Sequence, residues 1–292
     1  MSHNIATIHR TGPLATVQDL GRPGHMGTGI PVSGAVDRRS HGLAQRLVGN
    51  AESRAGIEAT MGGLELSFSA DVTVAVTGAE LEVFVGSRRE ATNAVLRVPA
   101  GTRVRLGAPR AGLRSYIAVA GGFEVPALFG SRSTDLLSGL GPDPLAEGDE
   151  LPVGVPDTAE APAAPEARVE QAAVAPLSTS VEVRLLPGPR IDWFTRAALD
   201  TLRSESYTVG ARSNRIGVRL EGAALERERS GELTSEGIVR GAVQVPAGGE
   251  PLVFMADHPT TGGYPVIAVV HPEDQHLLAQ LGPGGRVRFR MD

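Results

Sequence analysis

Cysteine and lysine are both absent from this chain of 292 residues, and all 28 basic residues are therefore arginine. Without cysteine the chain has no disulfide, no thiolate nucleophile and no thiolate-bound zinc or iron–sulfur cluster. Without lysine it has no pyridoxal Schiff base, no P-loop lysine and no biotinylated lysine of its own. Aromatic residues make up only 4% of the chain, so the core is expected to consist of Val, Leu, Ile and Ala.

The charge and the hydropathy pattern exclude two further classes of partner. The net charge is −5, and the arginines do not cluster with aromatic residues, so we expect no nucleic acid partner. No run approaches the roughly 18 apolar residues of a membrane helix, and residues 1–12 lack the apolar core of a secretion signal. We therefore expect no membrane partner and a cytoplasmic location.

The 37 glycines and 21 prolines are too many for a helical protein, because both residue types interrupt regular elements and favour turns. Apolar runs of about five residues, several rich in β-branched residues, predict short strands. These runs are residues 72–77, 81–85, 94–98, 103–106, 115–120, 181–186, 252–256, 266–270 and 286–290. The sequence therefore predicts a mainly β protein with a few helices (α+β).

Three segments have helical spacing. Residues 35–48 place Val36, Leu43 and Leu47 near one face and end at a glycine. A second helix is expected after Asp192, as its cap, and a third is expected to begin at Pro272.

Residues 156–180 form an Ala/Pro/Glu-rich stretch with almost no bulky apolar side chain, which indicates a linker or a long surface loop. It divides the chain into predicted domains 1–155 and 181–292. Two short matches connect these halves: residues 98–101 recur at 245–248, and residues 117–119 recur at 267–269. We therefore expect two β-barrel domains that arose by internal duplication and face each other across a cleft.

Two polar stretches in the first half are candidate sites. Residues 16–24 present Gln18 and Arg22, although the same stretch also fits a turn in which Asp19 caps the backbone and pairs with Arg22. Residues 130–135 place Arg132 between Ser131 and Ser133. An arginine among hydroxyls suits a carboxylate or a phosphate, and the alternative is an Arg132–Asp135 salt bridge.

Two further candidates lie in the second half. Residues 213–220 contain Arg215 and Arg219, a weak signal by itself. Residues 257–265 are more informative, because two hydroxyls followed by two glycines let backbone N–H groups approach an anionic oxygen closely. This stretch contains Asp257, Thr260, Thr261, Gly262, Gly263 and Tyr264. The alternative is a hairpin loop with Tyr264 packed on the barrel.

Other kinds of site find little support. The seven histidines form no HExxH motif, so no metal site is expected. No serine lies in a GxSxG motif, and no phosphate-binding loop is present.

Taken in order, these stretches resemble one family, the biotin-dependent carboxyltransferases, which includes allophanate hydrolase subunit 2, KipA and the C subunit of 5-oxoprolinase. The residues that carry the resemblance are 12–14, 16–24, 33–37, 47–50, 130–135, 187–189, 215–217, 235–237, 241–246 and 260–265. They extend over nearly the whole chain. One departure is that His258 and Pro259 stand where family members usually have a basic residue and a glutamine.

The resemblance implies two cyclophilin-like barrels and a partner chain that is similar to the B subunit of 5-oxoprolinase or to allophanate hydrolase subunit 1. No cofactor is expected to be bound covalently. ATP should bind elsewhere in the complex, because the chain has no phosphate-binding loop, and biotin, where it takes part, would come on a separate carrier, because the chain has no lysine. The chemistry shared by these systems is an amide carbonyl whose oxygen gains negative charge. Thr261, Gly262 and Gly263 would then donate to that oxygen, with Asp257 and Tyr264 orienting the site. Gln244 would contact the amide, and Arg132 or Arg215 would bind a carboxylate or a phosphate.

Three functions compete on this basis. The first is a subunit of an ATP-dependent, multi-chain enzyme that opens 5-oxoproline to glutamate. The second is a urea carboxylase or allophanate hydrolase subunit. The third is a regulatory partner of a kinase inhibitor without turnover.

Overall fold

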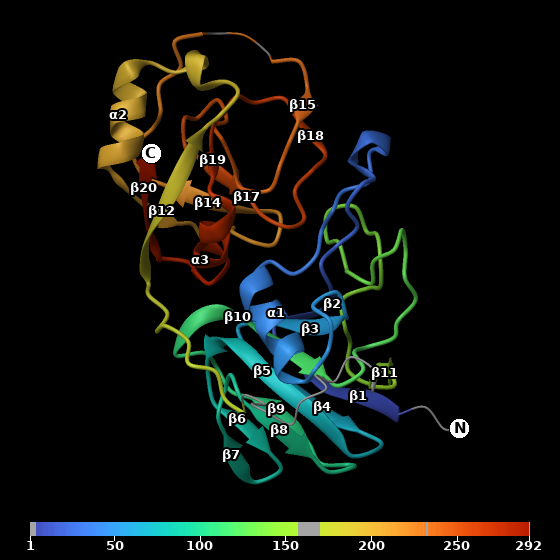
Figure 1. Ribbon diagram of the computed structural model, residues 1–292. Helices are drawn as coiled ribbons and strands as arrows, with labels where there is room; N and C mark the ends of the chain where they lie inside the picture. The colour runs from blue at the N-terminus through green and yellow to red at the C-terminus, as the bar shows by residue number, and fades with distance from the viewer. Residues whose placement is uncertain (1–3, 157–169, 230, 232, 292) are drawn as a thin grey trace. The chain divides into compact units, whose positions relative to one another are not determined.

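The computed structural model describes residues 4–156, 170–229, 231 and 233–291 (Figure 1). These residues are mainly β with a few short helices, as predicted. They divide into two compact units. The first unit contains residues 1–22, 37–135 and 139–177, and the second contains residues 23–36, 136–138 and 178–292.

The predicted domains 1–155 and 181–292 stay a prediction. The chain crosses between the two compact units more than once. Two segments from the N-terminal half, residues 23–36 and 136–138, belong to the second unit. Of the predicted linker 156–180, residues 157–169 lie outside the described residues. Next to them, Glu170 O accepts a hydrogen bond from Val95 N at 2.8 Å.

The first unit contains two sheets. One has the order β11 (Glu150–Val153), β1 (Asn4–Thr11), β4 (Leu64–Phe68), β9 (Val104–Leu106), β6 (Val83–Val85) and β7 (Arg88–Glu90). The other has the order β2 (Leu14–Gln18), β3 (Gly56–Thr60), β10 (Ala111–Val119), β5 (Val72–Glu80) and β8 (Val95–Val98). One apolar cluster, to which both sheets contribute, forms the core of this unit.

Strand periodicity determines which side chains face this core. In β5, Val74 and Val76 belong to the core, whereas the alternate residue Thr77 donates to Ser40 O in α1 (Arg38–Leu47) at 2.7 Å. Helix α1 begins later than the predicted residue 35 because Asp37 caps it, accepting from Ser40 N at 2.9 Å.

The expected barrel in the first half is wrong for the described residues, because both sheets are open there. Strands β6, β7 and β9 have only three residues each, and β6 and β7 extend the first sheet as a short flap instead of pairing with the second sheet. The two sheets therefore enclose their core by packing rather than by closure of a hydrogen-bonded ladder.

The second unit does contain a closed barrel of seven strands. Their order is β12 (Ser180–Pro187), β19 (Val266–Val270), β16 (Ala242–Gln244), β17 (Leu252–Phe254), β14 (Gly217–Glu221), β13 (Ser206–Val209) and β20 (Arg286–Met291). The ring closes where β20 pairs in parallel with β12. A separate ribbon joins β15 (Glu236–Gly237) to β18 (Thr261–Gly262).

Two helices accompany this barrel. Helix α2 (Arg196–Ser204) is capped by Thr195 rather than by Asp192, which lies in the preceding 3-10 turn Ile191–Trp193. The third predicted helix starts at Pro272 as a 3-10 turn and continues as α3 (Gln275–Ala279). None of the described helices has the length and hydropathy needed to cross a membrane.

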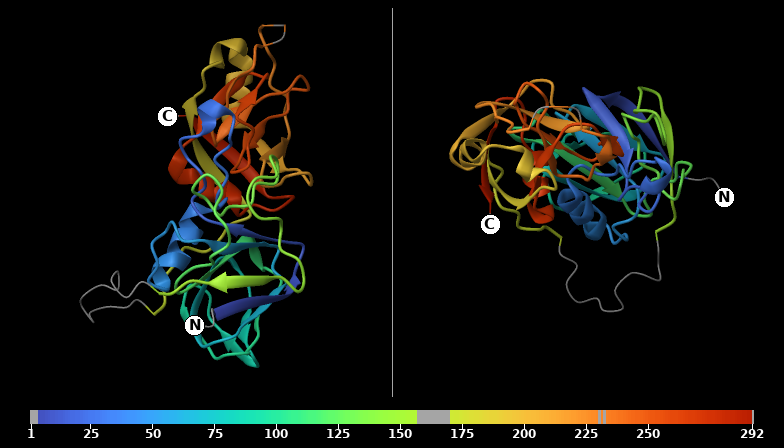
Figure 2. Two further views of the ribbon diagram at one scale, coloured as in Figure 1. Left: turned by 90° about the vertical axis from the view of Figure 1, so that its right-hand side faces the viewer. Right: turned by 90° about the horizontal axis from the view of Figure 1, so that it is seen from above.

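The segment 23–36 is an integral part of the second unit. Val36 is fully buried in the barrel's apolar cluster, and Arg240 donates to Ala35 O at 3.1 Å and also to Val36 O. In Figure 2 this blue segment lies beside the orange and red strands. A stretch distant in sequence thus belongs to the same unit as the candidate residues 215, just before β14, and 257, just after β17.

Candidate functional site

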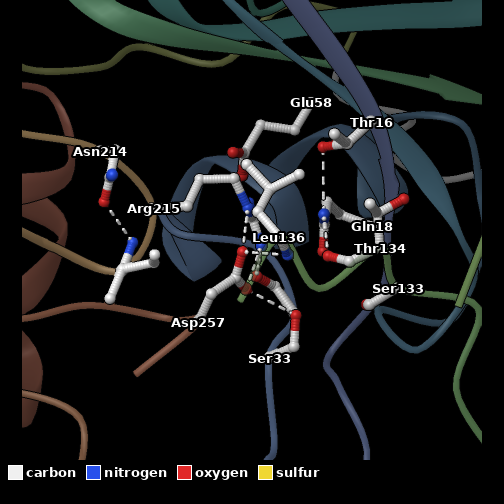
Figure 3. A network of polar contacts seen from close by, with 12 residues as sticks. Thr16, Gln18, Ser33, Glu58, Ser133, Thr134, Leu136, Asn214, Arg215 and Asp257 are labelled. Carbon is white, nitrogen blue, oxygen red and sulfur yellow. Dashed lines mark hydrogen bonds and ion pairs between the residues drawn. The ribbon is translucent and has the colours of Figure 1, made fainter. Parts of the chain in front are cut away.

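Asp257 lies just after β17, where its carboxylate accepts four hydrogen bonds (Figure 3). Arg215 donates through Nε to Oδ2 and through Nη2 to Oδ1, each at 2.9 Å. Ser33 Oγ donates to Oδ1 at 2.7 Å, and Leu136 N donates to Oδ2 at 3.1 Å. Because Ser33 and Leu136 belong to the two segments from the N-terminal half, this carboxylate fastens both of them to the barrel.

The ion pair between Arg215 and Asp257 is almost fully enclosed, with exposed side-chain fractions of 1% and 0%. Arg215 also donates from Nη2 to Gly34 O at 2.9 Å. The pairing is bidentate and satisfied by further hydrogen bonds, which is the condition under which a buried ion pair persists. Its contacts are therefore those of a residue pair that holds the fold together.

A second buried carboxylate, Asp19, organises the other candidate loop. Its Oδ1 accepts from Ser131 Oγ and from Ser133 Oγ, each at 2.6 Å, and from Gly21 N at 2.7 Å. Its Oδ2 accepts from Arg132 N at 2.6 Å. The two serine hydroxyls thus donate to Asp19 and fix the path of the loop.

The side chain of Arg132 differs from its neighbours. It is partly buried, and no carboxylate pairs with its guanidinium among the described residues. Its Nε atom is buried and has no hydrogen-bond partner there. The predicted alternative, a salt bridge to Asp135, is likewise not found in that part of the chain. Asp19 fixes the backbone of Arg132, and no carboxylate among the described residues neutralises its guanidinium.

Gln18 and Arg22 lie in the interior of the first unit, and each is fully buried. Gln18 Nε2 donates to Thr16 Oγ1 at 3.0 Å and to Thr134 O at 2.9 Å (Figure 3). Arg22 donates through Nη2 to Ser133 O. Both side chains therefore support the loop that carries Arg132.

The loop of residues 257–265 combines exposed and paired groups. Thr261 and Gly262 form β18, which pairs with β15, and Ile238 N donates to Thr260 O at 2.9 Å. Neither Gly262 nor Gly263 has a left-handed φ, so the loop does not use glycine for backbone conformation. Thr261 and Gly263 are exposed, which leaves these positions accessible to a ligand.

Close packing is the reason for glycine at position 262. A Cβ atom there would lie 2.8 Å from Gln244 Nε2 and 3.2 Å from the Ile238 side chain. The same Gln244 nitrogen donates to Tyr264 O at 3.0 Å. Gln244 is 4% exposed, so its amide directly supports the loop between Gly262 and Tyr264.

Comparison with known proteins identifies the family. Residues 28–291 match the model for the carboxyltransferase domain, subdomain A and B. The chain is 39% identical to the C subunit of 5-oxoprolinase from Escherichia coli (strain K12) over 285 residues, which cover 97% of this chain and 89% of that protein. The chain belongs to the carboxyltransferase domain family. The resemblance that the sequence motifs indicated is thereby confirmed.

Two further carboxyltransferase-domain relatives show how the family is distributed. The C subunit of 5-oxoprolinase from Haemophilus influenzae is 34% identical over 278 residues, 94% of this chain and 87% of that protein. The crystal structure of Kluyveromyces lactis urea amidolyase matches 99% of this chain with a TM-score of 0.89 and 27% identity. This chain spans 19% of that longer protein. The domain therefore occurs both as a separate subunit and within a longer polypeptide.

One residue near the loop of this carboxyltransferase domain was missed by sequence reasoning. Arg227 donates through Nη2 to Val245 O, and its guanidinium carbon lies 5.8 Å from the centre of the Tyr264 ring. In the sequence it stands in a run of alternating charges that looks like a solvated surface. Only the fold brings it to residue 264.

The described part of the chain contains no group of three or more His, Asp or Glu side chains arranged to hold a metal ion. His258, which stands at the position of the family departure, instead has its Nδ1 atom 2.8 Å from Pro259 O.

Gly262→Ala is expected to lower the turnover of the assembled enzyme about fivefold, which corresponds to the loss of roughly one hydrogen bond. The added methyl group must displace the Gln244 amide from Tyr264 O. The measurement is kcat alongside the thermal unfolding midpoint. Gly237→Ala is the matched control, because a Cβ there meets no atom within 4 Å. Equal activity of both variants would show that this contact has no functional role.

Proposed function

We propose that this chain is the C-type subunit of a multi-chain, ATP-dependent 5-oxoprolinase that opens 5-oxoproline to glutamate. Its homology to the C subunit of 5-oxoprolinase extends over 97% of the chain. The structural observation that supports the proposal is Arg132, whose backbone N–H donates to Asp19 and whose guanidinium has no carboxylate partner among the described residues. Such a group suits the carboxylate of a small acid or a phosphate.

The proposed chemistry concerns the amide carbonyl of 5-oxoproline. Its oxygen gains negative charge when the ring amide is attacked, and prepositioned donors stabilise that charge. Thr261, Gly262 and Gly263 are proposed as the segment that supplies them; the first two pair with β15, and Gly263 lies beyond that pairing. Gln244 and Tyr264 would hold the segment, since Gln244 Nε2 donates to Tyr264 O.

The other predicted site residues are proposed as positioning residues. Asp257 and Arg215 bind each other, and Ser131 and Ser133 bind Asp19. Gln18 and Arg22 support the loop that carries Arg132 from beneath. Because these side chains are occupied by such contacts, we expect them to affect catalysis indirectly, by positioning Arg132 or residues 260–264.

The partner and the cofactors remain proposals of the same kind. We expect a chain similar to the B subunit of 5-oxoprolinase to complete the enzyme, and ATP to bind elsewhere in the assembly. Biotin, if it takes part, would come on a separate carrier, since this chain has no lysine to which it could be attached.

An internal duplication also stays a proposal, and one detail supports it. The repeated segments 98–101 and 245–248 close with the same hydrogen bond, because Pro99 O accepts from Thr102 N and Pro246 O accepts from Gly249 N, each at 3.0 Å, although φ is left-handed at Gly101 and not at Gly248. Each turn follows a strand, β8 in one case and β16 in the other. A common cyclophilin-like ancestor for both units would explain this.

The second candidate is a carboxyltransferase subunit for urea or allophanate. It is favoured by the matches to proteins called urea amidolyase, of which that of Lachancea kluyveri is 30% identical over 95% of this chain. That match covers only 16% of the relative, whereas the match to the Escherichia coli C subunit covers 89% of that protein. The higher identity to the Escherichia coli C subunit, 39% against 30%, therefore favours the first candidate.

The deciding experiment purifies this chain with its partner subunits and follows ADP release. Release that depends on 5-oxoproline, with matching formation of glutamate, would support the proposed function. Release only with urea and a biotinylated carrier would support the second candidate. A stable complex that turns over neither substrate would contradict both and favour a regulatory role.

A further inference from the structure

Arg227 lies among the residues that support the 260–264 loop. Its guanidinium faces the Tyr264 ring at 5.8 Å and donates through Nη2 to Val245 O. Val245 N in turn donates to Pro265 O at 3.1 Å, and the preceding residue, Gln244, donates to Tyr264 O. Contacts that begin at Arg227 therefore lead directly to the loop proposed to hold the substrate oxygen.

The charge of Arg227 is not neutralised within the described residues. The other arginine near the ribbon, Arg190, donates to both oxygens of Glu236, through Nε at 3.0 Å and through Nη2. Arg227 has no carboxylate partner in the described part of the chain, and its Nε atom is buried there without a hydrogen-bond partner. Burial also lowers the pKa of the Arg227 guanidinium, since it disfavours the charged form.

A partly desolvated cation without a counter-charge is costly to a folded protein. The guanidinium has five N–H donors in a planar fork, of which the Val245 carbonyl takes one. The remaining donors match a planar group with two negatively charged oxygens. Tyr264, which is 46% exposed, holds the guanidinium by its ring and leaves the ligand access from solvent.

We propose that Arg227 and Tyr264 form a carboxylate-binding subsite that determines substrate specificity. Arg227 would bind the carboxylate of the substrate acid, or a bicarbonate with the same planar oxygens. The inference rests on the proposed function in taking residues 260–264 as the substrate site. Of the two roles proposed above for Arg132, the carboxylate of the substrate would then belong to Arg227.

The first test measures binding to the whole isolated chain and therefore needs no turnover. Trp193 is the single tryptophan and is a built-in reporter, because Trp193 O accepts from Glu228 N at 2.9 Å, next to Arg227. Its fluorescence would be titrated with 5-oxoproline, with bicarbonate and with 2-pyrrolidone, the uncharged lactam without a carboxylate. Saturable binding of either anion but not of 2-pyrrolidone is expected, and the tighter anion identifies the source of the carboxylate.

The variants separate charge from packing. Arg227→Ala should weaken anion binding about 10- to 100-fold, the loss typical of a charge-assisted pair. Arg227→Lys, which retains the charge but not the planar fork, should keep part of the anion affinity. Tyr264→Ala should weaken anion binding, whereas Tyr264→Phe should not. Arg229→Ala is the control, since Arg229 is exposed and pairs with Asp192 at 2.8 Å.

In the assembled enzyme, Arg227→Ala should raise KM for 5-oxoproline more than it lowers kcat, whereas a purely structural role would lower the unfolding midpoint without this split. Unchanged anion binding in a folded Arg227→Ala chain, or equal binding of 2-pyrrolidone by wild type, would overturn the inference. If the wild-type assembly does not turn over 5-oxoproline but the chain still binds anions through Arg227, only the proposed function would be contradicted.

Discussion

Asp257→Ala is expected to lower the free energy of unfolding by about 3–5 kcal/mol, the usual cost of breaking a buried ion pair by removing one partner. The substitution removes the carboxylate to which Arg215 donates twice, and leaves the Ser33 hydroxyl and the Leu136 amide without their acceptor. Urea denaturation with a determined m-value is the direct measurement.

The segments from the N-terminal half make this prediction specific. Ser33 and Leu136 belong to those segments. In Asp257→Ala, the backbone amides of residues 23–36 and 136–138 should therefore exchange hydrogen faster, before any change in the barrel strands. The double variant Asp257→Ala with Arg215→Ala should lower the free energy of unfolding by less than the sum of the two single variants, because each single variant breaks the same ion pair. A fully stable Asp257→Ala chain that has lost activity would show that Asp257 acts in chemistry rather than in folding.

Arg132→Ala is expected to lower kcat/KM of the assembled enzyme for 5-oxoproline about 10- to 100-fold, the loss typical of a hydrogen bond to a charged group. The fold should be little affected, because the loop is held by the Arg132 backbone N–H and the serine hydroxyls on Asp19, which this change leaves in place. Activity and the unfolding midpoint are measured together.

Two controls sharpen the Arg132 experiment. Arg132→Lys retains the positive charge but cannot bind two oxygens side by side, so we expect only partial activity. Arg97→Ala removes an exposed arginine from β8 and should behave as wild type. Wild-type kcat/KM in Arg132→Ala would remove the observation on which the proposed carboxylate or phosphate role depends.

Much of the local structure could be predicted because it depends on neighbouring residues. The runs 72–77 and 266–270 are strands, since short β-branched stretches between turns have few other ways to bury their side chains. Pro272 begins a helix for an equally local reason. The turn alternative for residues 16–24 was right in part, since Asp19 accepts from Gly21 N.

The partners of the buried polar groups could not be predicted in this way. Asp257 and Ser33 are separated by more than two hundred positions, and their hydrogen bond exists only because the segment 23–36 belongs to the second unit. Arg132 and Arg215 have the same chemistry in the sequence, yet Arg215 is paired inside the barrel and Arg132 has no carboxylate partner among the described residues.

The sequence by itself determined the family, the mainly β class and the short list of polar stretches, because motif spacing, glycine content and strand periodicity are local properties. Only the tertiary structure decided that, among the described residues, one half closes as a barrel and the other does not. It also decided which candidate side chains form hydrogen bonds or ion pairs within the protein. It also brought Arg227 to Tyr264. The physical reason is that long-range packing selects the hydrogen-bond partner of each buried charge. A carboxylate or guanidinium without an oppositely charged partner can therefore be recognised only in the folded structure.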